Sequence, residues 1–130
     1  MTPSQRELRT FSGLRRIVAT LHGPEGCPWD RVQTHRSLRP YLIEEAQEAL
    51  SAIDDGDPAG LCEELGDLLL EVLLQVQIAE ENGDFRLADV IEGIAGKLVH
   101  RHPHVFGDAV AETPEAVIDQ WDELKQRERG

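Results

Sequence analysis

Positive charge is scarce in this sequence of 130 residues. Thirteen Lys and Arg stand against twenty-five Asp and Glu, which gives a formal net charge of -12 at pH 7 and a pI near 4.7. Nucleic-acid backbones and anionic membranes are bound by clustered positive charge, so neither is expected as a partner. Between Tyr41 and Phe85 there is no Lys or Arg, although about half of the acidic residues lie there. Water or a metal cation must offset the repulsion within that segment.

Cysteines and long apolar runs are also few. The two cysteines, Cys27 and Cys62, lack CxxC spacing and cannot build a disulfide framework, so a cytoplasmic location is expected. No apolar run approaches the roughly 20 residues of a membrane span, and the opening residues do not resemble a signal peptide. Hydrophobic residues make up 40% of the chain and charged residues 29%. This balance is typical of a globular protein, and we expect residues 1–130 to form a single domain.

Apolar residues recur at three- and four-residue spacings, which predicts an all-α fold without a sheet. Helices are expected at about residues 4–21, 37–53, 59–81 and 86–101, and a last one after an N-cap at Thr113. The Gly- and Pro-rich stretches at residues 23–30, 54–58 and 102–107 are expected to be loops. Short connections between long helices favour antiparallel packing, hence a bundle of four to five helices.

The helix expected at residues 59–81 is apolar nearly all round in its middle. Such a helix belongs at the centre of a bundle or in a subunit interface. We therefore expect a homo-oligomer, with a homodimer as the first choice and a tetramer as the alternative.

Two of the expected helices each carry acids three residues apart, Glu45 with Glu48 and Glu64 with Asp67. Residues at i and i+3 share a helix face, and a tight turn at residues 54–58 makes the two helices an antiparallel hairpin. Counting back from the turn places Glu48 opposite Glu64 and Glu45 opposite Asp67. Four carboxylates are therefore predicted to converge. Two further acids follow the same faces: Glu44, beside Glu45, and Glu71, one turn beyond Asp67.

Four close carboxylates cannot all stay ionised in a partly dry site without a cation. Oxygen ligands suit Mg²⁺ or Mn²⁺. The alternative is that the acids are solvated helix faces. A di-iron carboxylate site is excluded, because it needs Glu-x-x-His on two helices and no histidine lies between Tyr41 and Phe85.

The pattern Glu44-Glu45-x-x-Glu48 followed by Glu64-x-x-Asp67 resembles the metal motif of the MazG family of nucleotide pyrophosphohydrolases, in the all-α NTP pyrophosphatase superfamily. The resemblance covers about residues 8–127. Its other motifs are Gly26-Cys27-Pro28-Trp29-Asp30 with Gln33-Thr34, Glu64-Leu65-Gly66-Asp67-Leu68-Leu69, Lys97-Leu98 with Arg101-His102-Pro103-His104-Val105-Phe106, and Trp121 with Lys125. One departure is His100, which stands where the family often has arginine.

The resemblance implies hydrolysis of nucleoside triphosphates at the α–β phosphate bond, to the monophosphate and pyrophosphate. The implied role is nucleotide-pool control or removal of non-standard nucleotides. The implied ligands of Mg²⁺, for which Mn²⁺ is a substitute, are Glu45, Glu48, Glu64 and Asp67. Glu44 is implied to support these ligands or to activate water.

The remaining implied site residues bind substrate. Lys97 and Arg101, four residues apart on one helix face, are implied to act in catalysis by meeting phosphate oxygens. Trp29 and Trp121 are candidates for the base and ribose end, because an indole can stack on a nucleobase. Asp30 and Lys125 complete this set.

Other interpretations stay open from the residues alone. The acids could form the docking face of a non-catalytic interaction module, or the enzyme could be a cousin acting on dUTP or phosphoribosyl-ATP. The two tryptophans could be core anchors, and Lys97 and Arg101 a solvated helix end. A zinc site at His100, His102 and His104 is disfavoured by the close spacing and the intervening proline.

Overall fold

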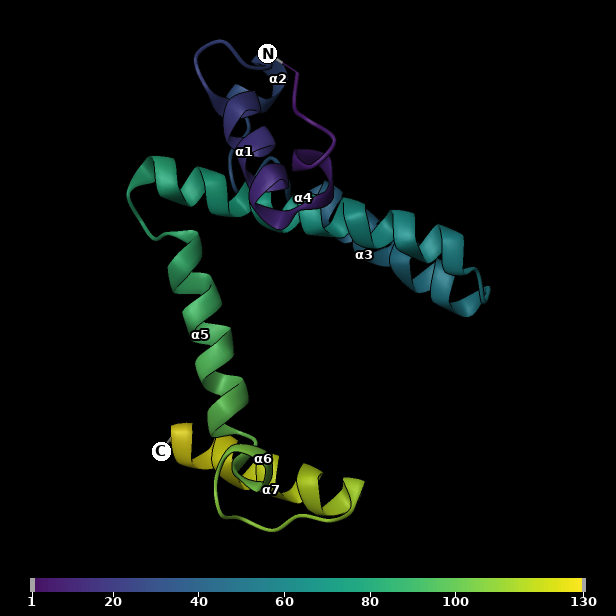
Figure 1. Ribbon diagram of the computed structural model, residues 1–130, viewed down its shortest axis with the longest axis vertical. Helices are drawn as coiled ribbons and strands as arrows, with labels where there is room; N and C mark the ends of the chain where they lie inside the picture. Colours follow the sequence, from purple (N-terminus) through teal and green to yellow (C-terminus); the bar gives the residue numbers. More distant parts are fainter. Residues whose placement is uncertain (1, 130) are drawn as a thin grey trace. The chain divides into compact units, whose positions relative to one another are not determined.

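The computed structural model describes residues 2–129, and every regular element within them is helical (Figure 1). In chain order they are the 3₁₀ turn η1 (Glu7–Arg9) and the helices α1 (Phe11–His22), α2 (Pro28–Arg31), α3 (Arg39–Asp54), α4 (Pro58–Asn82), α5 (Leu87–His100), α6 (Pro103–Phe106) and α7 (Pro114–Arg129). The expected all-α fold class is confirmed. The chain divides into two compact units, the first ending at Arg86 and the second beginning at Leu87.

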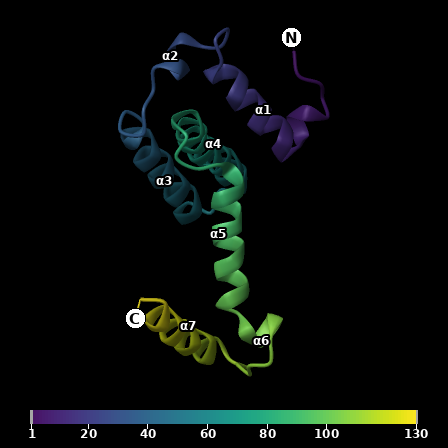
Figure 2. The same cartoon turned by 90° about the vertical axis from the view of Figure 1, so that its left-hand side faces the viewer.

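Helices α3 and α4 form an antiparallel hairpin in the first unit, side by side along their length (Figure 1, Figure 2). Gly56 makes the turn with a φ of 62°, a conformation that favours glycine. Asp57 is the N-cap of α4, as predicted, and its Oδ1 accepts a hydrogen bond from the Gly60 N–H at 3.0 Å. Gly83, with a φ of 77°, ends the helix. These local signals set the register of the hairpin.

The core of the first unit lies around the C-terminal half of α4. There α1 packs against α4, and an ion pair of 2.6 Å joins Arg15 to Glu80. The buried apolar residues are Val18, Leu38, Ala49, Ala52, Leu73, Leu74, Val76, Ile78 and Ala79. On α4, complete burial begins at Glu71, whereas the N-terminal half of the helix is half-buried or exposed. The hairpin is thus anchored at one end and open toward its turn.

The first expected helix, at residues 4–21, is interrupted, so that prediction was wrong. Thr10 is extended, with φ −121° and ψ 151°, and separates η1 from α1. Its Oγ1 accepts a hydrogen bond from the Gly13 N–H at 3.1 Å, so this side chain caps a new helix start. Gly13 also lies so close to Glu7 that a Cβ there would be 1.9 Å from the Glu7 carbonyl oxygen. The apolar periodicity continues across the break, which is why the sequence pattern did not show it.

Two stretches expected to be loops each contain a single helical turn, α2 and α6. Proline opens both turns, where its missing N–H and fixed φ are compatible with a helix start. The loop before α2 is tied back to α1 by a hydrogen bond of 2.9 Å from the Cys27 N–H to the Leu21 carbonyl.

The second unit consists of α5, α6 and α7. The Thr113 cap is confirmed, because its Oγ1 accepts a hydrogen bond from the Ala116 N–H at 3.1 Å. The Gln120 amide lies 2.9 Å from His104, and Arg101 pairs with Glu128 at 2.9 Å. These contacts hold α7 against the end of α5 and against α6. No helix within residues 2–129 is both long enough and apolar enough to span a bilayer.

Candidate metal centre

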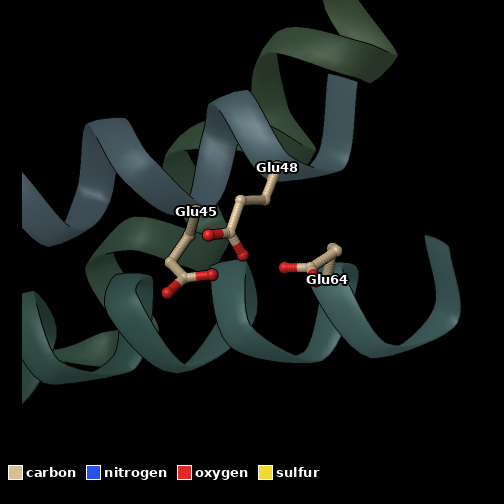
Figure 3. A group of neighbouring side chains, drawn as sticks. All are labelled: Glu45, Glu48 and Glu64. Carbon is tan, nitrogen blue, oxygen red and sulfur yellow. The ribbon is translucent and has the colours of Figure 1, made fainter. Parts of the chain in front are cut away.

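Three glutamates converge between the two helices of the hairpin. Helix α3 supplies Glu45 and Glu48, and α4 supplies Glu64. One carboxylate oxygen from each lies within 4.8 Å of the other two. Figure 3 shows the three side chains directed toward one another across the space between α3 and α4. The antiparallel register predicted from the turn therefore brings acids from both helices to one place.

The electrostatic state of the three acids shows how close they are. A hydrogen bond with Glu48, together with desolvation and the charges of Glu48, Asp67 and Glu45, raises the pKa of Glu64 to about 7. Partial burial, and then the charges of Asp67, Glu48 and Glu44, raise the pKa of Glu45. Each shift opposes ionisation, so the centre holds more negative charge than its own groups can stabilise.

Several carboxylate oxygens of this region are buried without a hydrogen-bond partner. They are Oε2 of Glu45, Oε2 of Glu64 and Oε2 of Glu71. An unpartnered buried acceptor is unfavourable unless a donor or a cation satisfies it. The possible ligand atoms here are all carboxylate oxygens, which hard divalent cations prefer. The residues present therefore fit a divalent metal ion.

The other predicted acids lie beside this group. Asp67 is half-buried, and its charge raises the pKa of Glu45, Glu64 and Glu71, but its oxygens are not within the three-acid convergence. Glu44 is exposed, and its charge acts on Glu45. The structure thus brings together three of the four expected ligands, with Asp67 and Glu44 as charged neighbours.

The two basic residues expected at the phosphates belong to the second unit. The Arg101 Nη2 pairs with the Glu128 Oε2 at 2.9 Å, and the His100 Nε2 lies 3.5 Å from the Glu128 Oε1. The hydrogen bond from Arg101, and then the charges of Arg101, His100 and Lys97, lower the pKa of Glu128. Together these three basic residues stabilise an anionic group at the end of α5.

The two tryptophans have different surroundings. Trp29, on α2, is 48% exposed, and its ring meets that of Tyr41 edge to face, with centroids 5.8 Å apart. Trp121, on α7, is half-buried with an unpartnered indole N–H, and its ring lies 5.3 Å from that of His102. Trp29 is therefore about half exposed beside Tyr41, whereas Trp121 is more buried within its unit.

Two predicted substrate residues, Asp30 and Lys125, are half-buried. Tyr41 was not singled out in the sequence, although it precedes Glu45 by four residues and so shares a face of α3 with the acids. Among residues 2–129 no second group of three His, Cys, Asp or Glu side chains converges.

Comparison with known proteins agrees with this geometry. The family model for the MazG nucleotide pyrophosphohydrolase domain matches residues 33–106. A nucleoside triphosphate pyrophosphohydrolase/pyrophosphatase MazG from Thermotoga maritima is 49% identical over 92% of this chain and 46% of its own length. A nucleoside triphosphate pyrophosphohydrolase from Escherichia coli is 45% identical over 87% of this chain and 43% of its own length. The chain thus spans less than half the length of these curated relatives.

The fold is similar to that of a solved structure as well. The crystal structure of a MazG-related protein from Thermotoga maritima aligns with a TM-score of 0.71 and 29% sequence identity, over 87% of this chain and 96% of that chain. The family model covers more than half of the chain and includes all three converging glutamates. This chain therefore belongs to the MazG nucleotide pyrophosphohydrolase family.

Proposed function

We propose that the chain hydrolyses nucleoside triphosphates at the α–β phosphate bond, with Mg²⁺ held between α3 and α4. The observation that carries the proposal is the convergence of Glu45, Glu48 and Glu64, with unpartnered buried oxygens on Glu45 and Glu64. Mn²⁺, which has the same preference for oxygen ligands, is expected to substitute. The names of the relatives from T. maritima and E. coli agree with this substrate class.

The carboxylates act in the proposed reaction by holding and orienting. Glu45, Glu48 and Glu64, joined by Asp67, hold the ion, and the chemistry that Mg²⁺ supplies when bound is polarisation of the α-phosphate and a lower pKa for bound water. Glu44 is exposed at the edge of the group, where it either supports the ligands or accepts the proton of the attacking water. The new bond joins the water oxygen to the α-phosphorus, and pyrophosphate leaves with the electrons of the α–β bridge.

Lys97 and Arg101 are proposed to bind phosphate oxygens of the substrate. The arrangement in the second unit supports this role, because the same basic face already stabilises the Glu128 carboxylate. Substrate phosphate would replace that carboxylate as the anion.

The aromatic residues are proposed to bind the nucleoside end. Trp29 supports this role through its exposed ring beside Tyr41, one helical turn along α3 from Glu45. Trp121, with Asp30 and Lys125, completes the proposed substrate contacts.

We also propose that the two units act as one catalytic domain in the cytoplasm. The continuous family match supports this, because residues 33–106 run across the boundary between Arg86 and Leu87.

We further propose a homodimer, since Leu65, Leu69 and Val72 on α4 remain 50%, 39% and 43% exposed. Light scattering at micromolar concentration tests this assembly, and a monomer would contradict it.

Variants of the converging acids test the activity. Glu48→Gln or Asp67→Asn is expected to abolish pyrophosphate release while the helical circular dichroism is unchanged, because each removes a proposed ligand charge but keeps the side-chain shape. Glu63→Gln changes an exposed acid of α4, the helix that carries Asp67, so it is the matched control and should retain activity. The assay follows pyrophosphate from the common and the oxidised triphosphates with Mg²⁺. Retained turnover in either ligand variant at saturating Mg²⁺ would contradict the assignment.

The same panel separates the alternatives. A cousin enzyme would prefer dUTP or phosphoribosyl-ATP over the other substrates. For a non-catalytic docking module, Mg²⁺ or Mn²⁺ would leave the melting temperature unchanged at constant ionic strength, whereas an ion bound to the native state raises it. The buried, unpartnered oxygens favour the metal-binding alternative, because a solvated docking face would leave such atoms in contact with water.

A further inference from the structure

Gln75 ties the loop between α2 and α3 to helix α4. Its Nε2–H donates a hydrogen bond of 3.3 Å to the His35 carbonyl oxygen, and its Oε1 accepts one from the His35 Nδ1–H. The two residues lie 40 positions apart in the sequence. Gln75 is half-buried on α4, and its neighbours Leu74 and Val76 are buried in the core. The loop is therefore bound to the buried half of the hairpin.

The same loop is bound to α2 by a chain of side-chain hydrogen bonds. The Gln33 Nε2–H donates to the Trp29 carbonyl oxygen at 2.8 Å, and the Gln33 Oε1 accepts from the Ser37 Oγ–H at 2.7 Å. Ser37 and Thr34 cap each other. The Thr34 N–H donates to the Ser37 Oγ at 2.8 Å, and the Ser37 N–H donates to the Thr34 Oγ1 at 3.1 Å. Residues 33–37 are thus cross-linked among themselves as well as to Trp29.

The proposed reaction gives no part to Gln33 and Thr34, although both belong to a motif of the family resemblance. Their hydrogen bonds join groups of the loop and of α2, and neither residue belongs to the three-acid group. Linked polar contacts of this kind restrict a segment to one conformation. The contacts of Gln33 and Thr34 therefore indicate a role in holding the chain rather than in the chemistry.

Trp29 is the residue that this arrangement holds near the two helices of the hairpin. Its ring meets that of Tyr41 edge to face at 5.8 Å, and Tyr41 precedes Glu45 by four residues on α3. Residues 64, 67, 71 and 75 follow at three- and four-residue spacing, so Gln75 shares a face of α4 with Glu64. At about 1.5 Å of rise per residue, the two lie about 17 Å apart along the helix. Trp29 is thus connected to both helices that supply the proposed metal ligands.

We propose that Gln75 and Gln33 are positioning residues for the nucleoside end of the substrate, because together they hold Trp29 in place relative to α3 and α4. This inference rests on the proposed role of Trp29 in binding the base, and adds to it the residues that hold that ring. In this role neither glutamine touches the substrate. Stacking on a base requires a fixed ring position. Release of the loop therefore weakens nucleotide binding and leaves the reaction at the phosphates unchanged.

Fluorine NMR of the full chain, labelled with 5-fluorotryptophan, tests the positioning without substrate. The chain has two tryptophans, so two resonances are expected, and Trp29→Phe identifies the one from Trp29. Gln75→Met and Gln33→Met should each shift or broaden the Trp29 resonance and leave that of Trp121 in place. Methionine has the length of glutamine but cannot make its amide hydrogen bonds.

Gln77→Met is the matched control. Gln77 is also half-buried on α4, but its amide donates to Glu81 of the same helix, at 3.3 Å. Both fluorine resonances should therefore stay in place in this variant. Gln33 lies between α2 and α3, outside the helices, so Gln33→Met decides the test if circular dichroism shows that Gln75→Met does not fold.

Steady-state kinetics with a nucleoside triphosphate and Mg²⁺ tests the consequence for binding. Gln75→Met should raise KM about fivefold and keep kcat within about twofold, whereas Gln77→Met should change neither. Trp29→Ala should raise KM at least as much, and Gln75→Met added to it should raise KM no further. A glutamine that only stabilises the fold would instead give independent, additive effects.

The outcomes separate this inference from the proposed function. An unchanged Trp29 resonance in the folded variants, or additive effects on KM, would overturn the positioning role and leave the proposed hydrolysis intact. A KM that does not respond to Trp29→Ala would overturn it as well. Absence of pyrophosphate release by the unchanged protein at saturating Mg²⁺ would overturn the proposed function itself, and this role with it.

Discussion

Metal binding by this chain should depend strongly on pH near neutrality. The hydrogen bond that protonated Glu64 donates to the Glu48 carboxylate, together with desolvation and the charges of the surrounding carboxylates, raises the pKa of Glu64 to about 7 in the metal-free protein. A cation must therefore displace a proton from Glu64 whenever the pH lies below that value. With one such proton, the apparent affinity for Mn²⁺ should rise about tenfold between pH ~6 and pH ~8, most of it below pH ~7.

Electron paramagnetic resonance measures this dependence, because the signal of free Mn²⁺ decreases as the ion binds. Mn²⁺ is titrated at three pH values and constant ionic strength. Glu48→Gln is the informative variant, because it removes the largest cause of the raised pKa of Glu64. Its residual Mn²⁺ affinity should be lower but should vary less between pH ~6 and pH ~8. An affinity of the unchanged protein that does not vary across this range would refute the reasoning.

The raised pKa of Glu64 also determines how the stability of the metal-free protein changes with pH. The folded state holds the Glu64 proton more tightly than the unfolded state does, because the folded pKa is about 7 and the ordinary value is 4.5. The stabilising contribution of this proton is therefore lost as the pH rises through that interval. Melting temperatures in the presence of a chelator should fall from pH ~5 to pH ~7, and added Mg²⁺ should reverse the trend.

Two further outcomes follow from the packing. Gly26→Ala should destabilise the protein by about 2 kcal/mol in denaturant unfolding, because a Cβ there would lie 2.2 Å from the Leu21 carbonyl oxygen. Gly93→Ala, in open space on α5, should instead stabilise it by up to ~1 kcal/mol, and equal effects would contradict the packing. Glu128→Gln should lower the KM for a nucleoside triphosphate and leave kcat unchanged, since Arg101 loses its internal partner; a higher KM in steady-state kinetics would contradict this role.

The hairpin was predictable because its determinants are local. Asp57 and Pro58 mark the start of α4 by capping chemistry, and the short turn at Gly56 fixes which residues of α3 and α4 face each other. Spacing of three within each helix then sufficed to predict the convergence of Glu45, Glu48 and Glu64. The depth of Glu71 depends on tertiary packing, which the same periodicity does not report.

Other features depend on contacts between segments that no local pattern encodes. The break at Thr10 results from a side-chain cap and from the close approach of Gly13 to Glu7, while the apolar spacing continues through it. The pairing of Arg101 with Glu128 joins residues 27 positions apart. Sequence spacing grouped Arg101 with Lys97, but it could not show that the Arg101 guanidinium pairs with the Glu128 carboxylate.

Burial along α4 has a consequence for motion. The part of α4 that follows Glu71 is largely buried and packs against α1. The part of the hairpin that carries Glu48 and Glu64 ends instead in a turn with few buried side chains. Such a tip opens by local fraying at little cost in free energy. A cation held by α3 and α4 together would stabilise this end of the hairpin against fraying. Amide protons there should therefore exchange with solvent more slowly once metal is added. The bound ion would thus stabilise the same end of the hairpin that supplies its ligands.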